Sequence, residues 1–591
     1  MLKLLRKLSW FDWLLILVAV GLAVLQVYCT MTLVDYVNNI TAVTVNISNK
    51  VNSVGDITQT LDELTGELWF NAGIMLALAG GIAICQFVMG VISAFVSASF
   101  SRHIMSLVND KVTNFSLAEL NKFSTESLAT RVTNDVQQIR QALMMLLRSA
   151  IPAPITAVWA IIKIQATSGE LTLTTAVGIV LLVAGIATVS AIAIPQFKKI
   201  QNLLDKMNGI TQENLTGIRV IRAYNAEDYQ EKKFNDINTS LTKVQLFAGR
   251  TMAFISPIIT LIMNGLTLAL YWVGATLINA QVTDYAAIVS FIMLSSQVVM
   301  SFMMLLMMII FWPRASVSAN RIAAVLDTEG TIKDPKVEKP LNSVGEVTFD
   351  HVSFRYPDAQ ADVLEDITFT AKKGETVAFI GATGSGKSSL INLVTRLYDV
   401  TKGRILIDGV DIRDLKQKTL RSLIGFVPQK GILFSGSVRD NIALGNPKMS
   451  LAEVEKAAKV ACADEFVDKM DKGYDSEIAQ VGTNVSGGQR QRLCIARAVA
   501  IKPQILVFDD SFSALDFKTD RKVRDNLKEY AKDSTKLIVA QRIGTVMDAD
   551  RIVVLVDGKV VGNGTHKELL QSCPTYRDIA LSQLSKEELG L

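Results

Sequence analysis

Residues 377–394 read Val-Ala-Phe-Ile-Gly-Ala-Thr-Gly-Ser-Gly-Lys-Ser-Ser-Leu-Ile-Asn-Leu-Val. The first four residues have the continuous apolar pattern of a buried strand, and the last five have the apolar spacing of a helix. Between them lies a glycine-rich turn whose backbone N–H groups can close around phosphate oxygens, and the positive end of the following helix faces the same anion. A strand, a turn and a helix in this order predict a phosphate-binding loop.

The turn also supplies side chains that suit a nucleotide and its metal ion. Lys387 can reach the β- and γ-phosphates, and the hydroxyl of Ser388 can ligate Mg²⁺. The residues that we expect to contact the nucleotide here are Gly381, Thr383, Gly384, Ser385, Gly386, Lys387, Ser388 and Ser389.

Two further segments carry related chemistry. A second buried strand, 505–508, ends in Asp509 and Asp510, where a carboxylate at the end of a strand can hold Mg²⁺ through its water shell. Residues 486–489, Ser-Gly-Gly-Gln, open a helix and offer backbone donors to an anion. The chain therefore contains two helix ends suited to phosphate, and Asp509 is the expected metal-side residue.

Composition indicates what surrounds this site. The chain has 591 residues, half of them hydrophobic and only 20% charged, with a mean hydropathy of +0.32. This length predicts more than one folding unit, and this composition favours a membrane protein. The net charge of +4, from 60 basic and 56 acidic residues, gives no support to a nucleic-acid partner. Five scattered cysteines and three separated histidines indicate neither a disulfide framework nor a metal centre.

Long apolar runs ahead of the nucleotide motif predict six membrane-spanning helices, because each run reaches the roughly 20 residues that cross a bilayer. The first connection is acidic, whereas the connections after the second and fourth runs are rich in lysine and arginine, so both termini are expected in the cytoplasm. The runs lie near 11–34, 69–98, 142–164, 171–197, 252–279 and 284–312.

The two long inside connections, about 99–140 and 198–250, carry apolar residues at helical spacing between charges. They are predicted to be amphipathic helices that extend the spans, with a solvated loop as the alternative. The expected organisation is a transmembrane domain over 1–313, a linker over 314–344 and a soluble α/β domain over 345–591.

The order of these motifs resembles the ATP-binding cassette (ABC) family. Walker A corresponds to Gly381–Ser388, the signature to Ser486–Gln489 and Walker B to Ile505–Asp509. Further matches are the Q-loop residue Gln429, the adenine-stacking aromatic position Tyr356 and the D-loop residue Asp516.

This resemblance implies ATP and Mg²⁺ as cofactors, with Ser388, Gln429 and Asp509 on the metal side. In the family two cassettes pair head to tail, so that the signature of one chain completes the ATP site of the other. Six spans before one cassette are similar to a half-transporter of the exporter type, a transport ATPase that works as part of a dimer.

Two positions depart from the family pattern. The catalytic carboxylate after Walker B, usually Glu, is Asp510, which is one methylene shorter and predicts a poor general base. The switch histidine is replaced by Gln541, a neutral amide that can donate a hydrogen bond but cannot take up a proton. One interpretation is that these are tolerated variants in an active site.

The hypothesis that we favour is a degenerate, slowly hydrolysing ATP site in this chain, with Ser486, Gly487, Gly488 and Gln489 serving the competent site of a non-identical partner. That pattern resembles bacterial heterodimeric multidrug exporters, and it implies a multi-pass protein of the cytoplasmic membrane.

The last apolar run is rich in methionine and phenylalanine, which favours binding of varied hydrophobic or amphipathic compounds, although such residues also pack simply against helices or lipid. Alternatives within the same fold are a lipid, peptide or metal-chelate transporter. A different alternative is a regulatory subunit that holds ATP for a partner transporter.

Overall fold

The computed structural model describes residues 2–51, 58–167, 169–342 and 344–589. The chain forms two compact units, each with its own internal contacts. The first comprises the residues up to Asp110 together with Ala129–Asp327, and the second comprises Lys111–Leu128 together with Thr328–Leu591. A short piece of an early connection therefore folds with the C-terminal part of the chain.

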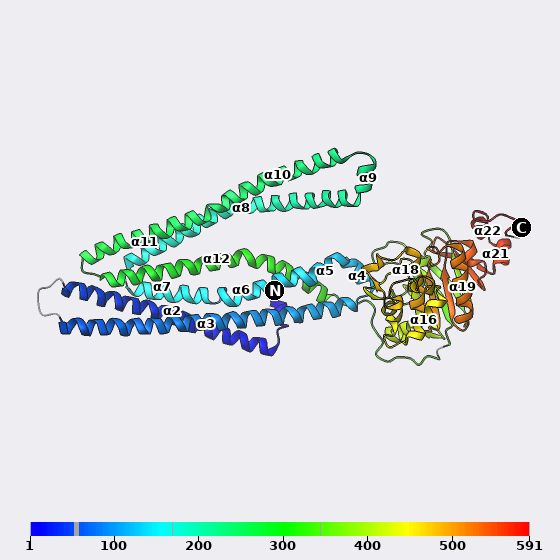
Figure 1. The fold of residues 1–591 in the computed structure, drawn as a ribbon, viewed down its shortest axis with the longest axis horizontal. Coiled ribbons are helices and arrows are strands. Elements are labelled where there is room, and N and C mark those ends of the chain that lie inside the picture. The colour runs from blue at the N-terminus through cyan, green and yellow to red at the C-terminus, as the bar shows by residue number, and fades with distance from the viewer. Residues whose placement is uncertain (1, 52–57, 168, 343, 590–591) are drawn as a thin grey trace. The chain divides into compact units, whose positions relative to one another are not determined.

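Long helices form the first unit (Figure 1), and within the described residues six stretches are long and apolar enough to cross a membrane. The six predicted spans are thereby confirmed. The helices that form this unit or lead into it are α1 (Leu2–Leu5), α2 (Trp10–Val51), α3 (Thr58–Thr113), α5 (Thr125–Thr130), the π-helical turn η1 (Arg131–Asp135), α6 (Val136–Met145), the π-helical turn η2 (Leu146–Ala150), α7 (Pro152–Thr167), α8 (Gly169–Thr216), α9 (Ile218–Ala223), α10 (Glu227–Ala253), α11 (Ile255–Asn279) and α12 (Tyr285–Asp327).

The helices continue well past their apolar windows, because the charged segments beyond them keep apolar residues at helical spacing. Both inside connections are largely helical, as their pattern predicts. In Figure 1, α8 and α10 lie side by side, with α9 between their ends. Pro195 lies within α8 and Pro313 within α12, and neither proline ends its helix.

The core of the first unit lies where α2, α7, α8, α11 and α12 pack together. Met31, Leu182, Leu270 and Val298 from four of these helices are almost fully buried in it. The hydroxyls of Thr175 and Ser295 lie 3.0 Å apart in a buried contact between α8 and α12.

The second unit is an α/β domain. Its helices are α4 (Leu117–Phe123), α13 (Lys387–Val394), α14 (Gln417–Ser422), α15 (Val438–Ile442), α16 (Leu451–Val460), α17 (Asp464–Val467), α18 (Gly487–Ala500), α19 (Phe517–Tyr530), α20 (Ile543–Val546), α21 (His566–Ser572) and α22 (Pro574–Leu581). Its strands are β1 (Val347–Phe354), β2 (Leu364–Ala371), β3 (Thr376–Ile380), β4 (Lys402–Ile407), β5 (Val410–Asp411), β6 (Ile424–Val427), β7 (Gly436–Ser437), β8 (Glu477–Ile478), β9 (Ile505–Asp509), β10 (Thr535–Val539), β11 (Arg551–Val556) and β12 (Lys559–Gly564).

Three sheets position the site. The largest has the order β12-β11-β3-β10-β9-β6, in which all neighbours run parallel except the pair β11 and β12. An antiparallel sheet has the order β2-β1-β4-β5, and β7 pairs with β8. The parallel strands are mostly apolar, with their polar residues near the strand ends, as is typical of sheets that are covered on both faces. Their carboxyl ends meet at one edge, where ligands bind in open α/β sheets.

Helix α4 belongs to the second unit although it lies in the first inside connection, and the resemblance to the family implies a helix there that docks into a cassette. Leu117 and Ala118 pack against a buried apolar cluster to which both larger sheets contribute. Asn121 Nδ2 donates to the hydroxyl of Tyr398 at 3.2 Å, and the backbone N–H of Thr331 donates to Oε1 of Glu119 at 2.9 Å. The early connection is thus held by apolar contacts and by hydrogen bonds.

Candidate nucleotide site

The phosphate-binding loop follows β3, which lies between β11 and β10 in the largest sheet. Gly386 precedes the first residue of α13 with a φ of +95°, and a Cβ there would lie 2.7 Å from Cδ2 of Leu364. Gly384 has a φ of +89°, yet a Cβ there would meet nothing within 4 Å. Gly386 is therefore required for packing, whereas Gly384 is required for backbone conformation beside open space.

The side chain of Lys387 folds back into this loop. Its Nζ donates to the carbonyl oxygens of Gly381 and Ala382 at 2.8 and 2.7 Å and to Oγ of Ser385 at 3.3 Å. Only 8% of the residue is exposed. Burial lowers the pKa of Lys387, and the carboxylates of Asp510 and Asp509 oppose that effect. The loop thus surrounds the ammonium group of Lys387 at the place where we expect the phosphates of the nucleotide to bind.

An acidic pair faces the loop from β9. The hydroxyl of Ser388 donates to Oδ1 of Asp509, the last residue of that strand, at 2.9 Å. Burial raises the pKa of Asp509, the bond from Ser388 opposes this rise, and the carboxylate of Asp510 adds to it. A hydroxyl and a carboxylate oxygen in contact are the hard ligands that Mg²⁺ prefers, so the donor set fits the predicted metal.

Three loops converge on the carboxylate of Asp510. Oδ2 accepts a hydrogen bond from Nε2 of Gln541 at 2.9 Å and another from Nε2 of Gln429 at 3.4 Å. Asp510 has a φ of +47°, a left-handed conformation that Asp tolerates better than most residues. Burial raises the pKa of Asp510, and the hydrogen bond from Gln429 opposes the rise. The structure therefore joins three residues that the sequence places far apart.

Tyr356 follows β1, an interior strand of the antiparallel sheet, two residues beyond the end of that strand. Its hydroxyl is 2.8 Å from Oγ of Ser389 in α13, and its ring meets that of Tyr398 edge to face, with 5.2 Å between the ring centres. The predicted aromatic position is thus connected directly to the helix that begins at the phosphate-binding loop.

The signature segment forms the start of α18. The side chain of Ser486 accepts from the N–H of Gln489 at 3.2 Å, and the side chain of Gln489 accepts from the N–H of Ser486 at 2.9 Å. Ser486 and Gly487 are exposed, and a Cβ on Gly488 would lie 3.3 Å from the carbonyl oxygen of Ala514. Among the described residues, no hydrogen bond joins the signature to the phosphate-binding loop of the same chain.

Two residues that follow the acidic pair in sequence, Asp516 and Ser513, form hydrogen bonds that the sequence pattern did not predict. Asp516, the predicted D-loop residue, caps α19 by accepting from the N–H of Thr519 at 3.0 Å. Ser513 was not among the predicted site residues, yet its hydroxyl donates to the carbonyl oxygen of Asp510 at 2.8 Å. Ser513 opens the stretch 513–516 that resembles the D-loop, so the motif located this serine, but it gave no indication of the bond to Asp510.

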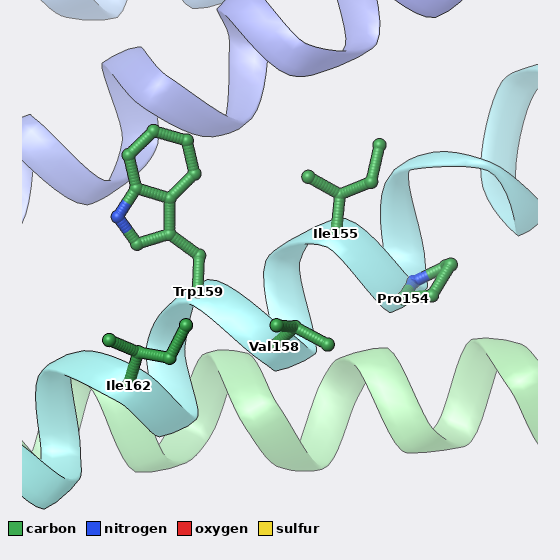
Figure 2. A pocket seen from close by; sticks show the side chains of 5 residues that line it. All are labelled: Pro154, Ile155, Val158, Trp159 and Ile162. Carbon is green, nitrogen blue, oxygen red and sulfur yellow. The ribbon is translucent and has the colours of Figure 1, made fainter.

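The transmembrane unit has an apolar hollow along α7. Figure 2 shows five side chains from this helix, and the hollow has a volume of about 510 Å³. The ring of Trp159 extends toward α2, where its centre lies 6.0 Å from that of Tyr28. Sequence reasoning missed this hollow, because apolar residues in a spanning helix carry no distinguishing pattern. Its lining residues are Pro154, Ile155, Val158, Trp159 and Ile162.

The methionines of the last span are less uniformly placed than their spacing suggests. Met300, Met304 and Met307 are exposed on α12, whereas Met293 and Met303 are partly buried against the core of the first unit.

Comparison with known proteins identifies the family of the chain. Residues 10–302 match the family model described as the ABC transporter transmembrane region, and residues 364–513 match the model described as ABC transporter. The chain is 39% identical to an uncharacterized ABC transporter ATP-binding protein of Mycobacterium tuberculosis over 88% of this chain and 89% of that protein. A similar protein of Bacillus subtilis is 37% identical over 88% of this chain and 90% of its own length.

Two further matches concern export. A Staphylococcus aureus protein, provisionally named a multidrug export ATP-binding/permease protein, is 36% identical over 64% of this chain and 65% of that protein. The structure of a bacterial Atm1-family ABC exporter with ATP bound has the same fold, with a TM-score of 0.78, 24% identity, and coverage of 96% of this chain and 98% of that one. The chain therefore belongs to the ABC transporter family, as a transport ATPase that joins six membrane-spanning helices to one ATP-binding cassette in the manner of an exporter half-transporter.

Proposed function

We propose that this protein exports hydrophobic or amphipathic compounds across a bacterial cytoplasmic membrane, using ATP. The apolar hollow on α7, the exposed methionines of α12 and the name of the Staphylococcus aureus relative support this substrate class. The lysine- and arginine-rich inside connections favour a cytoplasmic location for both termini and for the cassette. Lipid, peptide and metal-chelate transport are the alternatives that a substrate screen would separate.

Within the cassette, each site residue has a proposed role. On ATP binding, Lys387 exchanges its bonds to loop carbonyls for bonds to the β- and γ-phosphates. Ser388, Asp509 and Gln429 would hold Mg²⁺, which supplies charge neutralisation at the phosphates when bound. Tyr356 would stack on adenine.

We further propose that this chain's own ATP site is degenerate and that a different half-transporter completes the functional pair. The observation that carries this proposal is the 2.9 Å hydrogen bond from Nε2 of Gln541 to Oδ2 of Asp510. The bond directs the amide at the shortened carboxylate, and the amide stays neutral at physiological pH, because it neither takes up nor gives up a proton there. A general base must bond the attacking water, and here Oδ2, one of the two carboxylate oxygens of Asp510, already accepts from two amides.

The exposed signature helix completes the proposal. Ser486 and Gly487 at the start of α18 would face the γ-phosphate of ATP held by the partner's phosphate loop. Binding of two ATP molecules would close the cassettes and shift the transmembrane helices from inward- to outward-facing, because the contacts between each ATP and the signature of the other chain exist only in the closed state. Hydrolysis at the partner's site would reopen them.

ATP hydrolysis by purified protein tests this proposal. We expect activity only when the chain is combined with the half-transporter encoded beside it. In that pair, Asp510→Asn should reduce turnover modestly, whereas loss of the partner's catalytic carboxylate should abolish it. Comparable turnover by the lone chain would show a homodimeric exporter with a competent site and would overturn the asymmetric model.

The same hydrogen bond favours a second candidate, a regulatory subunit that binds ATP without driving transport. Lys387→Ala in the assembled pair separates the two. If transport persists while the equivalent substitution in the partner stops it, the regulatory function is supported. If both substitutions stop transport, this chain takes part in the transport cycle.

A further inference from the structure

The C-terminal segment holds the loop that carries Gln541. We call residues 540–542, between β10 and α20, the switch loop. The backbone N–H of Ile543 donates to Oε1 of Gln583 at 2.8 Å, and Nε2 of Gln583 donates to the carbonyl oxygen of Gln541 at 2.9 Å. One amide side chain therefore bonds the main chain on both sides of Arg542.

These bonds satisfy groups that the local backbone leaves open. The first N–H groups of a helix have no intrahelical acceptor, and Ile543 is the first residue of α20. A side-chain amide offers a donor on its nitrogen and an acceptor on its oxygen at the same time, as this pairing requires. A carboxylate at position 583 could accept from Ile543 but could not donate to Gln541.

Gln583 is itself anchored by the helix that precedes it. Tyr576 and Ala580 of α22 are completely buried in the cassette core, and the hydroxyl of Tyr576 lies 2.7 Å from Nδ1 of His566. The backbone N–H of Gln583 donates to the carbonyl oxygen of Ala580 at 3.1 Å. The amide thus projects from a fixed support, although its side chain lies at the surface.

The switch loop that Gln583 holds is bonded in turn to residues of the nucleotide site. Holding the carbonyl of Gln541 restricts its backbone, and its side chain reaches Oδ2 of Asp510. On the other side of the loop, Nη2 of Arg542 donates to the carbonyl oxygen of Ser513 at 3.2 Å, and Ser513 in turn bonds Asp510.

We propose that Gln583 is a positioning residue, which sets the direction in which Gln541 faces the γ-phosphate of ATP. The inference rests on the proposed function in one respect, namely that Gln541 contacts the γ-phosphate. Because ADP lacks that phosphate, the contribution of Gln583 is confined to ATP. Its signature is the ratio of ATP affinity to ADP affinity, a quantity that does not require hydrolysis.

The experiment measures equilibrium binding of fluorescent ATP and ADP with Mg²⁺ to the purified full-length chain. The variants are Gln583→Ala, Gln583→Glu and Gln541→Ala, and the matched control is Gln571→Ala, at an exposed glutamine of α21. We expect Gln583→Ala and Gln583→Glu to lower the ratio about threefold to tenfold, the range for one or two lost hydrogen bonds, with ADP affinity unchanged. The Gln571→Ala protein should match the wild type.

The remaining outcomes separate this inference from the proposed function. An unchanged ratio in both Gln583 variants, with a lowered ratio in Gln541→Ala, overturns the positioning role alone. Parallel losses of ATP and ADP affinity in Gln583→Ala also overturn it, because they indicate a general structural defect. If Gln541→Ala leaves the ratio unchanged, the γ-phosphate contact of Gln541 is absent and the role of Gln583 is rejected with it.

Discussion

Nε2 of Gln541 donates a hydrogen bond to Oδ2 of Asp510 at 2.9 Å, and this bond joins the two positions at which the cassette departs from its family pattern. The two departures are therefore in direct contact, and the effect of each residue depends on the other. Substitutions of residues in direct contact have non-additive effects, so the pair must be tested together as well as singly.

Restoring both family residues should restore hydrolysis at this chain's own site. We expect the Asp510→Glu, Gln541→His double variant to hydrolyse ATP about tenfold to a hundredfold faster than the wild type, because the longer carboxylate reaches water and the imidazole can carry charge. Each single variant should gain far less. The measurement is turnover in a pair whose partner carries Ala in place of its phosphate-loop lysine. A double variant no faster than the singles would contradict the coupling.

Replacement of Gly384 or Gly386 by Ala should have different effects, on ATP binding in the first case and on the stability of the cassette in the second. Gly384→Ala meets open space and costs only the backbone strain, about 1 kcal/mol, so the cassette should stay folded while ATP binding weakens at least tenfold. Gly386→Ala adds a contact 2.7 Å from Leu364, so the cassette itself should be destabilised. Thermal unfolding without nucleotide, followed by ATP titration, distinguishes the two. Equal losses of stability would show that the difference in space is unimportant.

Docking of α4 should depend on pH through Glu119. Burial alone would raise the pKa of Glu119, but hydrogen bonds from Ser116 and Thr331 outweigh it and lower the pKa below its ordinary value of 4.5. Because the unfolded chain then binds the proton more readily, the stabilisation is present at neutral pH and is lost as pH falls from that ordinary value through the lower folded value.

Glu119→Gln should therefore lower the unfolding temperature at pH 7, and its difference from the wild type should shrink as the pH approaches 4. The control is Glu529→Gln, at an exposed glutamate of α19. A difference that is constant from pH 7 to pH 4 would show that the charge of Glu119 does not hold α4.

An ion pair joins α2 to α7, and we expect it to form equally well when its acidic and basic residues exchange positions. Nζ of Lys163 lies 2.6 Å from both carboxylate oxygens of Asp35 and donates to the carbonyl oxygen of Met31 at 2.9 Å. The two side chains are 25% and 58% exposed, so solvent screening limits the pair to about 0.2–1 kcal/mol.

Asp35→Lys or Lys163→Asp alone should lower the unfolding temperature in detergent, and the double exchange should recover most of the loss. High salt should reduce the differences. Failure of the double variant to recover would mean that the carbonyl of Met31, rather than the carboxylate, determines the contribution of Lys163.

Much of this protein follows from local patterns. Apolar length predicts the spans, and the glycines, Lys387 and Asp509 predict the phosphate-binding loop and its acidic partner, because these features depend on residues adjacent in sequence or at strand ends. The site of Asp510 was also found by pattern. Its hydrogen bonds to Gln429 and Gln541 could not be, since they depend on which strands become neighbours in the sheet.

Other features have no local signature at all. Gln583 is an ordinary exposed glutamine in the sequence, and only the packing of Tyr576 brings it to the switch loop. The π-helical turns at Arg131–Asp135 and Leu146–Ala150 arise within segments whose composition predicts regular helix. Helix propensity predicts that a segment is helical. It does not predict where the backbone hydrogen bonds change to the π-helical pattern, because tertiary contacts determine that position.

The position of α4 has a consequence for biogenesis. Leu117, Ala118 and Asn121 are translated before the last four spanning helices, whereas the surface that they join, including Tyr398, is translated after them. The nascent cassette cannot complete this face from its own freshly synthesised residues. It binds a segment, α4, that was synthesised earlier and separated from it by four spanning helices. Completion of this face therefore couples the folding of the soluble domain to insertion of those helices into the membrane.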